Sequence, residues 1–326
     1  MPILRRFLVV TAVVTLLLGV LPVAAGAAVT APATSIAGGK DFACALDPTA
    51  SLVCWGTGGE GELDPPAGTF TAVTDGRYHA CALTPERSIV CWGSNLSPYP
   101  PYLTDQAVPP IGNTYAQVSA GGFFTCARTE VGGIVCWGGD NGPEGSTGIV
   151  TGAPVGPGFT QIAAGGFHTC ALTASAAITC WGGDWVGQAT PPGGTGWRLV
   201  AAGRTHSCAI DAATAIVCWG ENGDGRATPP AGSGWQAVVA GYAHSCALGP
   251  TGTITCWGDN TFGQRDAPAG AFVEIAAGAN FTLARAADGT VVAWGDGSAG
   301  QTTVPASVQP VPAPEPTPTP TPRFTG

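Results

Sequence analysis

The sequence predicts an all-β fold: a seven-bladed β-propeller of four-stranded blades with within-blade disulfides. Three observations predict it. A Trp-Gly pair recurs seven times at intervals of 37 to 45 residues, and the twelve cysteines form six couples whose members lie ten residues apart. The 50 glycines and 29 prolines, with only 10% charged residues, are typical of a turn-rich β protein with a large buried fraction.

Each repeat begins with an aromatic residue and a β-rich run to Ala-Gly. His-x-Cys-Ala-Leu, a turn, Ile-x-Cys-Trp-Gly, a polar loop and Pro-Pro follow. This pattern predicts four short strands per repeat, for example 159–164, 168–172, 178–181 and one near 188–191. Stacking such sheets radially in a closed ring buries both faces of each. A solenoid of the same period is the alternative, but it needs capping units, and the terminal repeats here look ordinary.

The cysteine couples predict one disulfide within each of six repeats. The members flank a short turn such as Pro48-Thr49-Ala50, so two antiparallel strands would place them directly opposite each other. In the seventh repeat Leu283 and Ala293 occupy both slots, and loss of both partners together is what a within-repeat bridge predicts. Zinc ligation would instead favour Cys-x-x-Cys spacing, which does not occur. The predicted bridges are Cys44–Cys54, Cys81–Cys91, Cys126–Cys136, Cys170–Cys180, Cys208–Cys218 and Cys246–Cys256.

The chain is expected to divide into a signal peptide (1–27), the propeller (28–307) and a Pro/Thr-rich tail (308–326). Arg5 and Arg6 precede a short apolar stretch, and Ala25-Gly26-Ala27 offers small residues for cleavage. A membrane anchor is the alternative, for which the apolar stretch is short. We therefore expect a secreted or cell-surface protein, in a compartment where cysteines oxidise. The tail should form an extended spacer, and whether it tethers the domain is left open.

The formal net charge is −9, and removal of the signal peptide takes two arginines with it. An acidic surface repels phosphate groups, so neither nucleic acid nor an anionic membrane surface is an expected partner. No later segment is apolar for long enough to span a membrane.

The four histidines occupy one slot of the repeat, two residues before the first cysteine. Phe fills the same slot in the other three repeats, so we interpret it as a packing position whose imidazole also forms a hydrogen bond. The glycines that end the first strand should relieve crowding or allow positive φ. The slot holds His79, His168, His206, His244, Phe42, Phe124 and Phe281.

The pattern Ala-Ala-Gly-x-x-His-x-Cys-Ala-Leu, followed by Cys-Trp-Gly-Asp-Asn-x-x-Gly-Gln, resembles the regulator-of-chromosome-condensation repeat over about residues 31–305. Members of that family normally carry Leu at the first Cys slot and Ala or Tyr at the second, so the paired cysteines are a departure. Residues 294–305 are similar to secreted bacterial members, including the β-lactamase inhibitory propeller. The resemblance implies a seven-bladed propeller that acts through protein contacts.

Because successive strands alternate in direction, the corners after the first and third strands of every repeat emerge on one face of the ring. Aromatic and charged residues collect there, whereas the turns of the other face are mostly Pro, Thr, Ser, Ala and Gly. Trp185 is the one Trp outside a repeating slot, which favours a binding anchor over its alternative, local packing. Aromatic and Arg anchors carry most of the energy of protein interfaces. The predicted protein-binding residues are Trp185, Tyr78, Phe123, Phe167, Tyr242, Phe262, Tyr99, Arg77, Arg204, Asp184 and Asp259.

The predicted function is a secreted protein-binding scaffold, with inhibition of an extracellular enzyme through this face as its specific form. Acidic corners would steer it toward a basic patch. A carbohydrate-binding propeller lectin is the alternative. We do not expect an enzyme, because no Gly-x-Ser-x-Gly, His-Glu-x-x-His or phosphate loop occurs. No cofactor or metal is expected, since residues 221–225 lack a full calcium loop. The insertion at 96–112 is either a recognition loop, which we favour, or a solvated bulge.

Overall fold

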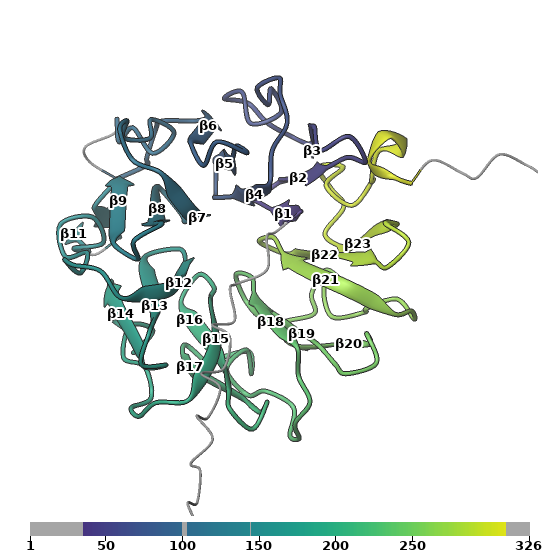
Figure 1. Ribbon diagram of the computed structural model, residues 1–326. Coiled ribbons are helices and arrows are strands. Elements are labelled where there is room, and N and C mark those ends of the chain that lie inside the picture. Colours follow the sequence, from purple (N-terminus) through teal and green to yellow (C-terminus); the bar gives the residue numbers. More distant parts are fainter. Residues whose placement is uncertain (1–34, 100–102, 144, 311–326) are drawn as a thin grey trace, which may run out of the picture.

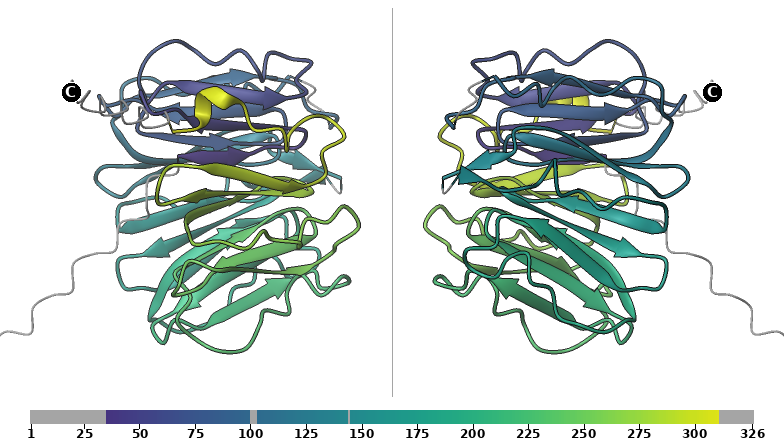
Figure 2. Two further views of the ribbon diagram at one scale, coloured as in Figure 1. Left: turned by 90° about the vertical axis from the view of Figure 1, so that its right-hand side faces the viewer. Right: turned by 90° about the vertical axis from the view of Figure 1, so that its left-hand side faces the viewer.

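The computed structural model describes residues 35–99, 103–143 and 145–310. The predicted signal peptide and residues 311–326 of the predicted tail lie outside the described residues. The described chain folds into seven three-stranded antiparallel sheets arranged side by side around a central axis (Figure 1). In side view, the strands run approximately along this axis, so the turns emerge on two opposite faces (Figure 2).

Each sheet is a meander whose strands pair in sequence order, with the first strand nearest the axis (Figure 1). The seven sheets are β1 (Ile36–Gly38), β2 (Phe42–Leu46) and β3 (Leu52–Gly56); β4 (Ala72–Asp75), β5 (His79–Leu83) and β6 (Ile89–Gly93); β7 (Tyr115–Ala120), β8 (Phe124–Thr129) and β9 (Ile134–Gly138); β12 (Phe159–Ala164), β13 (His168–Thr173) and β14 (Ile178–Gly182); β15 (Trp197–Ala202), β16 (His206–Asp211) and β17 (Ile216–Gly220); β18 (Ala237–Ala240), β19 (His244–Leu248) and β20 (Ile254–Gly258); β21 (Phe272–Ala277), β22 (Phe281–Ala286) and β23 (Val291–Gly295). A short hairpin of β10 (Asn141–Gly142) and β11 (Gly145–Ser146) and the 3-10 turn η1 (Ala306–Val308) complete the elements.

All six predicted disulfides are confirmed. In each couple the two cysteines are directly opposed in the register of the second and third strands, as Cys170 is to Cys180. Their Cα atoms lie 4.0 to 4.1 Å apart. In the seventh sheet Leu283 opposes Ala293, so the two residues fill the position of a disulfide with apolar side chains.

The predicted fourth strand is wrong for the described residues: every sheet of the ring has three strands. The segment expected near Gln188 runs as turns, and Pro191 and Pro192 lack the N–H groups that a strand ladder needs. The segment is bound in another way. The Gln188 carbonyl accepts a hydrogen bond from Nε1 of Trp219 in the next repeat. The Trp of all seven Trp-Gly pairs makes this bond, at 2.8 to 3.0 Å.

The same bond closes the ring, because Trp55 of the first repeat donates to the carbonyl of Gln301 in the last, at 2.9 Å. The Glu274 carboxylate of β21 also accepts hydrogen bonds from the backbone N–H and the hydroxyl of Ser35. Val308, where we expected the tail to begin, is fully buried in a cluster with Ile36 and Trp55. Figure 2 shows η1 lying against the first sheet. The first and last repeats of the described chain are therefore joined by hydrogen bonds and by apolar packing.

The seven glycines that end the innermost strands relieve crowding. None has a positive φ. A Cβ on Gly76, Gly121, Gly165, Gly203 or Gly241 would lie 2.3 to 2.7 Å from the carbonyl oxygen of the equivalent glycine in the next sheet, closer than real Cβ atoms approach. This close approach lets the corner amides donate across sheets at 2.9 to 3.2 Å, in a collar of six bonds (Arg77→Gly121, Gly122→Gly165, Gly166→Gly203, Arg204→Gly241, Tyr242→Ala279 and Ala279→Gly39).

The packing interpretation of the histidines is confirmed. All four are fully buried, and each Nε2 lies 2.7 to 3.0 Å from a Ser or Thr hydroxyl of the next sheet. Burial lowers the pKa of His79 and His206 to about 3, and that of His168 and His244 to about 4. These imidazoles are therefore neutral links between sheets at neutral pH.

Candidate functional site

The start of each second strand lies opposite the end of the third strand, as in the pairing of Phe42 with Gly56. The corner after the first strand and the loop after the third strand therefore emerge together, as expected. We call this side of the ring the mouth face. At its centre the collar surrounds a depression of about 100 Å³, the mouth. Behind the mouth, a channel of about 500 Å³ runs between the seven innermost strands.

Five predicted aromatic residues on the mouth face form an unbroken chain of ring contacts, which we call the aromatic arc. Its contacts run from Tyr78 to Phe123 (5.9 Å between ring centroids), Phe123 to Tyr99 (5.8 Å), Tyr99 to Phe167 (6.2 Å) and Phe167 to Trp185 (5.5 Å). These separations are those of favourable tilted and edge-to-face pairs. The arc crosses the second, third and fourth sheets, and the residues at its two ends, Tyr78 and Trp185, are more than one hundred residues apart in the sequence.

The members of the arc differ in exposure. Phe123 and Phe167 are 2% and 3% exposed, so they support the arc from within. Tyr78, Tyr99 and Trp185 are half-buried, and therefore offer apolar area and polar ring atoms to solvent on a fixed base. Tyr99 comes from the 96–112 insertion, whose Leu96 pairs with Leu103 in an isolated bridge. The insertion thus supplies part of the arc.

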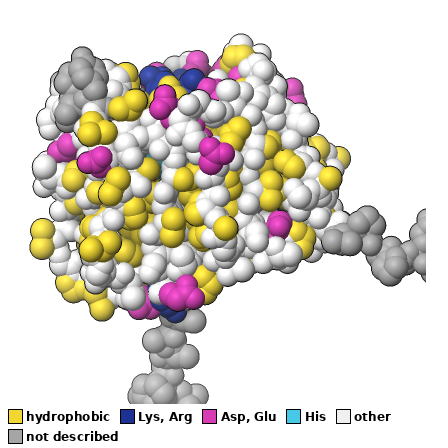
Figure 3. All heavy atoms as spheres, turned by 90° about the horizontal axis from the view of Figure 1, so that it is seen from above, with side chains coloured by type: hydrophobic (Ala, Val, Ile, Leu, Met, Phe, Trp, Pro, Cys, Tyr) yellow, Lys and Arg dark blue, Asp and Glu magenta, His cyan; other side chains and the backbone are white. Residues whose placement is uncertain are grey.

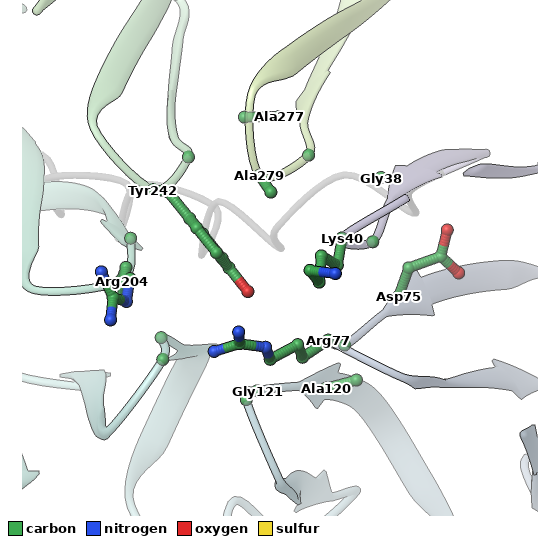
Figure 4. A pocket seen from close by; sticks show the side chains of 18 of the residues that line it. Gly38, Lys40, Asp75, Arg77, Ala120, Gly121, Arg204, Tyr242, Ala277 and Ala279 are labelled. Carbon is green, nitrogen blue, oxygen red and sulfur yellow. The ribbon is translucent and has the colours of Figure 1, made fainter. Parts of the chain in front are cut away.

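Cationic side chains lie beside the arc at the mouth. The Arg77 guanidinium carbon is 5.3 Å from the Tyr78 ring centroid, 5.6 Å from that of Phe123 and 5.6 Å from that of Tyr242 in the sixth sheet. Arg77 therefore reaches across the ring. The guanidinium carbon of Arg204 lies 5.5 Å from the ring centroid of Tyr242, and Nζ of Lys40 lies 5.4 Å from that of Tyr78. In Figure 4 the Arg77 guanidinium, the Lys40 amine and the Tyr242 hydroxyl point toward the middle of the mouth.

Asp75 is a residue that the sequence analysis missed. It occupies the slot before the collar glycine, which holds Ala in the other six repeats, and that single acidic exception was the available signal. Its Oδ2 accepts a hydrogen bond from the Cys44 backbone N–H at 3.0 Å, while its buried Oδ1 has no partner in the described structure. Burial raises the pKa of this carboxyl well above its usual range, opposed by the Cys44 hydrogen bond. In Figure 4 the carboxyl group points away from the mouth centre.

The other three predicted residues lie outside these contacts. Asp184 accepts hydrogen bonds from the Ala189 N–H and the Thr190 hydroxyl, which fold its own loop. Asp259 does the same with Thr261, and these bonds lower the pKa of its carboxyl against the opposing effect of burial. Phe262 is 48% exposed with no ring contact in the described structure. Lys40, in contrast, belongs with the mouth although it was not among the predicted binding residues.

The part of the chain that the structure describes contains no cluster of three or more His, Cys, Asp and Glu side chains that could hold a metal ion. Within the same residues, no helix has the length and hydropathy to cross a bilayer. The side of the ring wall shown in Figure 3 has few Lys and Arg atoms, and those visible lie toward the two ends of the ring axis.

Comparison with known proteins supports the fold. The model of the regulator of chromosome condensation (RCC1) repeat matches residues 159–188, 235–264 and 272–301. A search of curated proteins found no match. The six disulfides within the sheets indicate folding in an oxidising compartment.

Among solved structures, the ectodomain of the Arabidopsis thaliana receptor kinase ACR4 is 26% identical with a TM-score of 0.65, and the match covers 81% of this chain and 97% of that one. The ectodomain of the Physcomitrella patens receptor kinase CR4 is also 26% identical at a TM-score of 0.65, covering 80% and 73%. Yeast RCC1 (Prp20), solved with Kap60, shares the fold at 18% identity and a TM-score of 0.63, covering 79% of each chain. The chain thus carries RCC1-type repeats in a fold that matches RCC1-like propellers.

Proposed function

We propose that this chain is a seven-bladed propeller that binds an extracellular protein through its mouth face. The aromatic arc is the observation that carries the proposal. Tyr and Trp side chains that are partly exposed and held rigid from below lose little entropy on binding, and they are the residues that dominate interface energies. The opposite face is built mainly of small turn residues, so the asymmetry between the two faces favours the mouth face.

An extracellular location is part of the proposal. Disulfides persist in oxidising compartments, and the two 26%-identical neighbours are receptor ectodomains. The predicted signal peptide would deliver the chain there. Inhibition of an exported enzyme is the specific form of the proposal, and a β-lactamase is the first enzyme to test, by hydrolysis of a chromogenic β-lactam with and without the propeller.

The experiment uses the mature protein, immobilised and incubated with the extracellular protein fraction of its source. Wild type is compared with Tyr78→Ala/Trp185→Ala. Val131→Ala is the matched control, since Val131 is 79% exposed on a turn of the opposite face. If each anchor contributes about 2 kcal/mol, the affinity for the bound protein should fall nearly a thousandfold on the double variant, at about 1.4 kcal/mol per tenfold, and should be unchanged on the control. Equal recovery on all three proteins would refute the mouth face as the binding surface.

The lectin alternative has less support at the site. A sugar needs free hydrogen-bonding groups beside the aromatic platform. The Asp184 carboxylate next to Trp185 is already occupied by the Ala189 N–H and the Thr190 hydroxyl. A glycan array decides between the two: saccharide binding that is lost in Trp185→Ala would replace the protein-binding proposal.

A further inference from the structure

The two arginines at the mouth lack counter-charges. Among the described residues, ion pairs engage Lys40, Arg87, Arg226 and Arg285, but neither Arg77 nor Arg204. Arg226 is different: it is 6% exposed, and it forms ion pairs with Glu221 and Asp224. In an acidic protein, unpaired arginines against an aromatic surface indicate a site for an anionic group from outside.

Arg77 forms a side-chain hydrogen bond with Tyr78 but keeps further donor capacity. A guanidinium contacts aromatic rings through its flat face, and its N–H groups point outward in the plane. Nε of Arg77 is buried and has no partner in the described structure. The rings of Tyr78, Phe123 and Tyr242 fix the group in place, so little entropy is lost when an acceptor arrives.

The neighbouring groups at the mouth also favour an acceptor. Burial raises the pKa of Tyr242 to about 12, partly offset by Arg77 and Arg204, so its hydroxyl remains a donor. The two nearby carboxyl groups do not neutralise Arg77: Asp41 pairs with Lys40, and Asp75 accepts from Cys44 and points away from the mouth centre.

The size of the mouth limits what can enter. A cavity of about 100 Å³ holds about three water molecules, which is enough for one small polar group. Its floor is the glycine and alanine backbone of the collar. The aromatic arc begins at its edge, because Arg77 touches both Tyr78 and Phe123. An occupant therefore needs an anionic tip with apolar groups beside it, which a protein loop offers and free phosphate does not.

We propose that the mouth receives the carboxylate of an Asp or Glu side chain from the partner protein, bound by Arg77 and the Tyr242 hydroxyl with Arg204 and Lys40 nearby, while apolar neighbours of that side chain pack on the aromatic arc. This inference rests on the proposed function and specifies its partner. It replaces the basic partner patch that the acidic corners led us to expect.

The test selects binders from a display library of random constrained peptides on the folded mature protein. The selected peptides are then synthesised in acidic and Glu→Gln or Asp→Asn form. Affinities are measured for wild type, Arg77→Gln, Arg204→Gln and the control Arg198→Gln. Arg198 is exposed and lies near the start of β15, at the end of the strand away from the mouth. Because the Arg204 side chain is exposed, Arg204→Gln should keep the wild-type melting temperature.

The expected result is enrichment of peptides with an acidic residue beside an aromatic or aliphatic one. Removing the acid or Arg77 should each weaken binding about tenfold, and removing both should cost little more than either alone. Peptides without an acid that bind Arg77→Gln as well as wild type would overturn the inference. If Tyr78→Ala/Trp185→Ala abolishes their binding, the proposed function survives. Binding of inorganic phosphate or a sulfated saccharide in place of peptides would overturn both proposals, as would the absence of any enriched peptide.

Discussion

The buried histidines should make this protein sensitive to acid, and His206 allows the effect to be measured. Its side chain is fully buried, with Nε2 2.7 Å from the Ser245 hydroxyl. Burial lowers its pKa from 6.5 to about 3, with a smaller contribution from Arg226. As the pH falls below 6.5, the imidazole binds a proton in the unfolded chain but stays neutral in the folded chain, so the free energy of unfolding decreases between about pH 6.5 and pH 3. At pH 5, 1.5 units below the ordinary value, each such histidine costs about 2 kcal/mol, at about 1.4 kcal/mol per unit.

The variant His206→Phe/Ser245→Ala removes this cost with a pairing that the ring already contains. Phe42 packs with Ala80 in the equivalent positions of the first two sheets. We expect the free energy of unfolding of the variant, relative to wild type, to improve by about 2 kcal/mol between pH 7.5 and pH 5. Urea unfolding with intact disulfides, followed by tryptophan fluorescence, measures it. Ser245→Ala alone keeps the histidine and should retain the wild-type dependence on pH.

An equal difference between variant and wild type at both pH values would refute this reasoning. It would mean that His206 binds a proton in the folded ring as readily as in the unfolded chain, and that burial does not set its pKa.

Three further predictions concern the ring. Burial raises the pKa of the Asp75 carboxyl, so the free energy of unfolding of wild type falls as the pH rises from the ordinary Asp pKa to the raised pKa of the folded state. Asp75→Asn should therefore melt at a higher temperature than wild type at pH 8, and the difference should close toward pH 4. Identical melting temperatures at pH 8 would count against this prediction. Gly203→Ala places a Cβ 2.5 Å from the Gly241 carbonyl oxygen and should cost about 1–3 kcal/mol in urea unfolding; a neutral effect would show that the collar tolerates separation. Cys208→Leu/Cys218→Ala copies the seventh repeat and should fold normally by circular dichroism while losing about 2–3 kcal/mol; failure to fold would show that packing cannot replace this bridge.

The parts of the fold that the sequence predicts are those that repeat. The ten-residue cysteine couples place opposed positions on neighbouring strands, and the register confirms them in all six sheets. The slot shared by His and Phe similarly identifies a packing position. These inferences succeed because one geometric explanation must satisfy every copy at once.

What the sequence could not predict depends on contacts between repeats. The segment after each Trp-Gly pair accepts a hydrogen bond from the Trp of the following repeat through one carbonyl, and it does not pair as a fourth strand. Nothing in the local sequence distinguishes such a segment from a strand. Variable corners could be assigned to a face, but only the structure shows that Tyr99 from a long insertion joins Phe123 and Phe167 into one surface. Val308 looks like the start of a proline-rich tail until its burial against the first sheet is seen.

Radical footprinting of the propeller alone and in complex with its captured partner is the most direct test of the mouth face as a binding surface. Tyr78, Tyr99 and Trp185 are partly exposed, and their rings are readily oxidised, so binding should protect all three while leaving Val131 on the opposite face unchanged. Protection confined to Val131 and its neighbours, with the three aromatic rings oxidised as in the free protein, would contradict it.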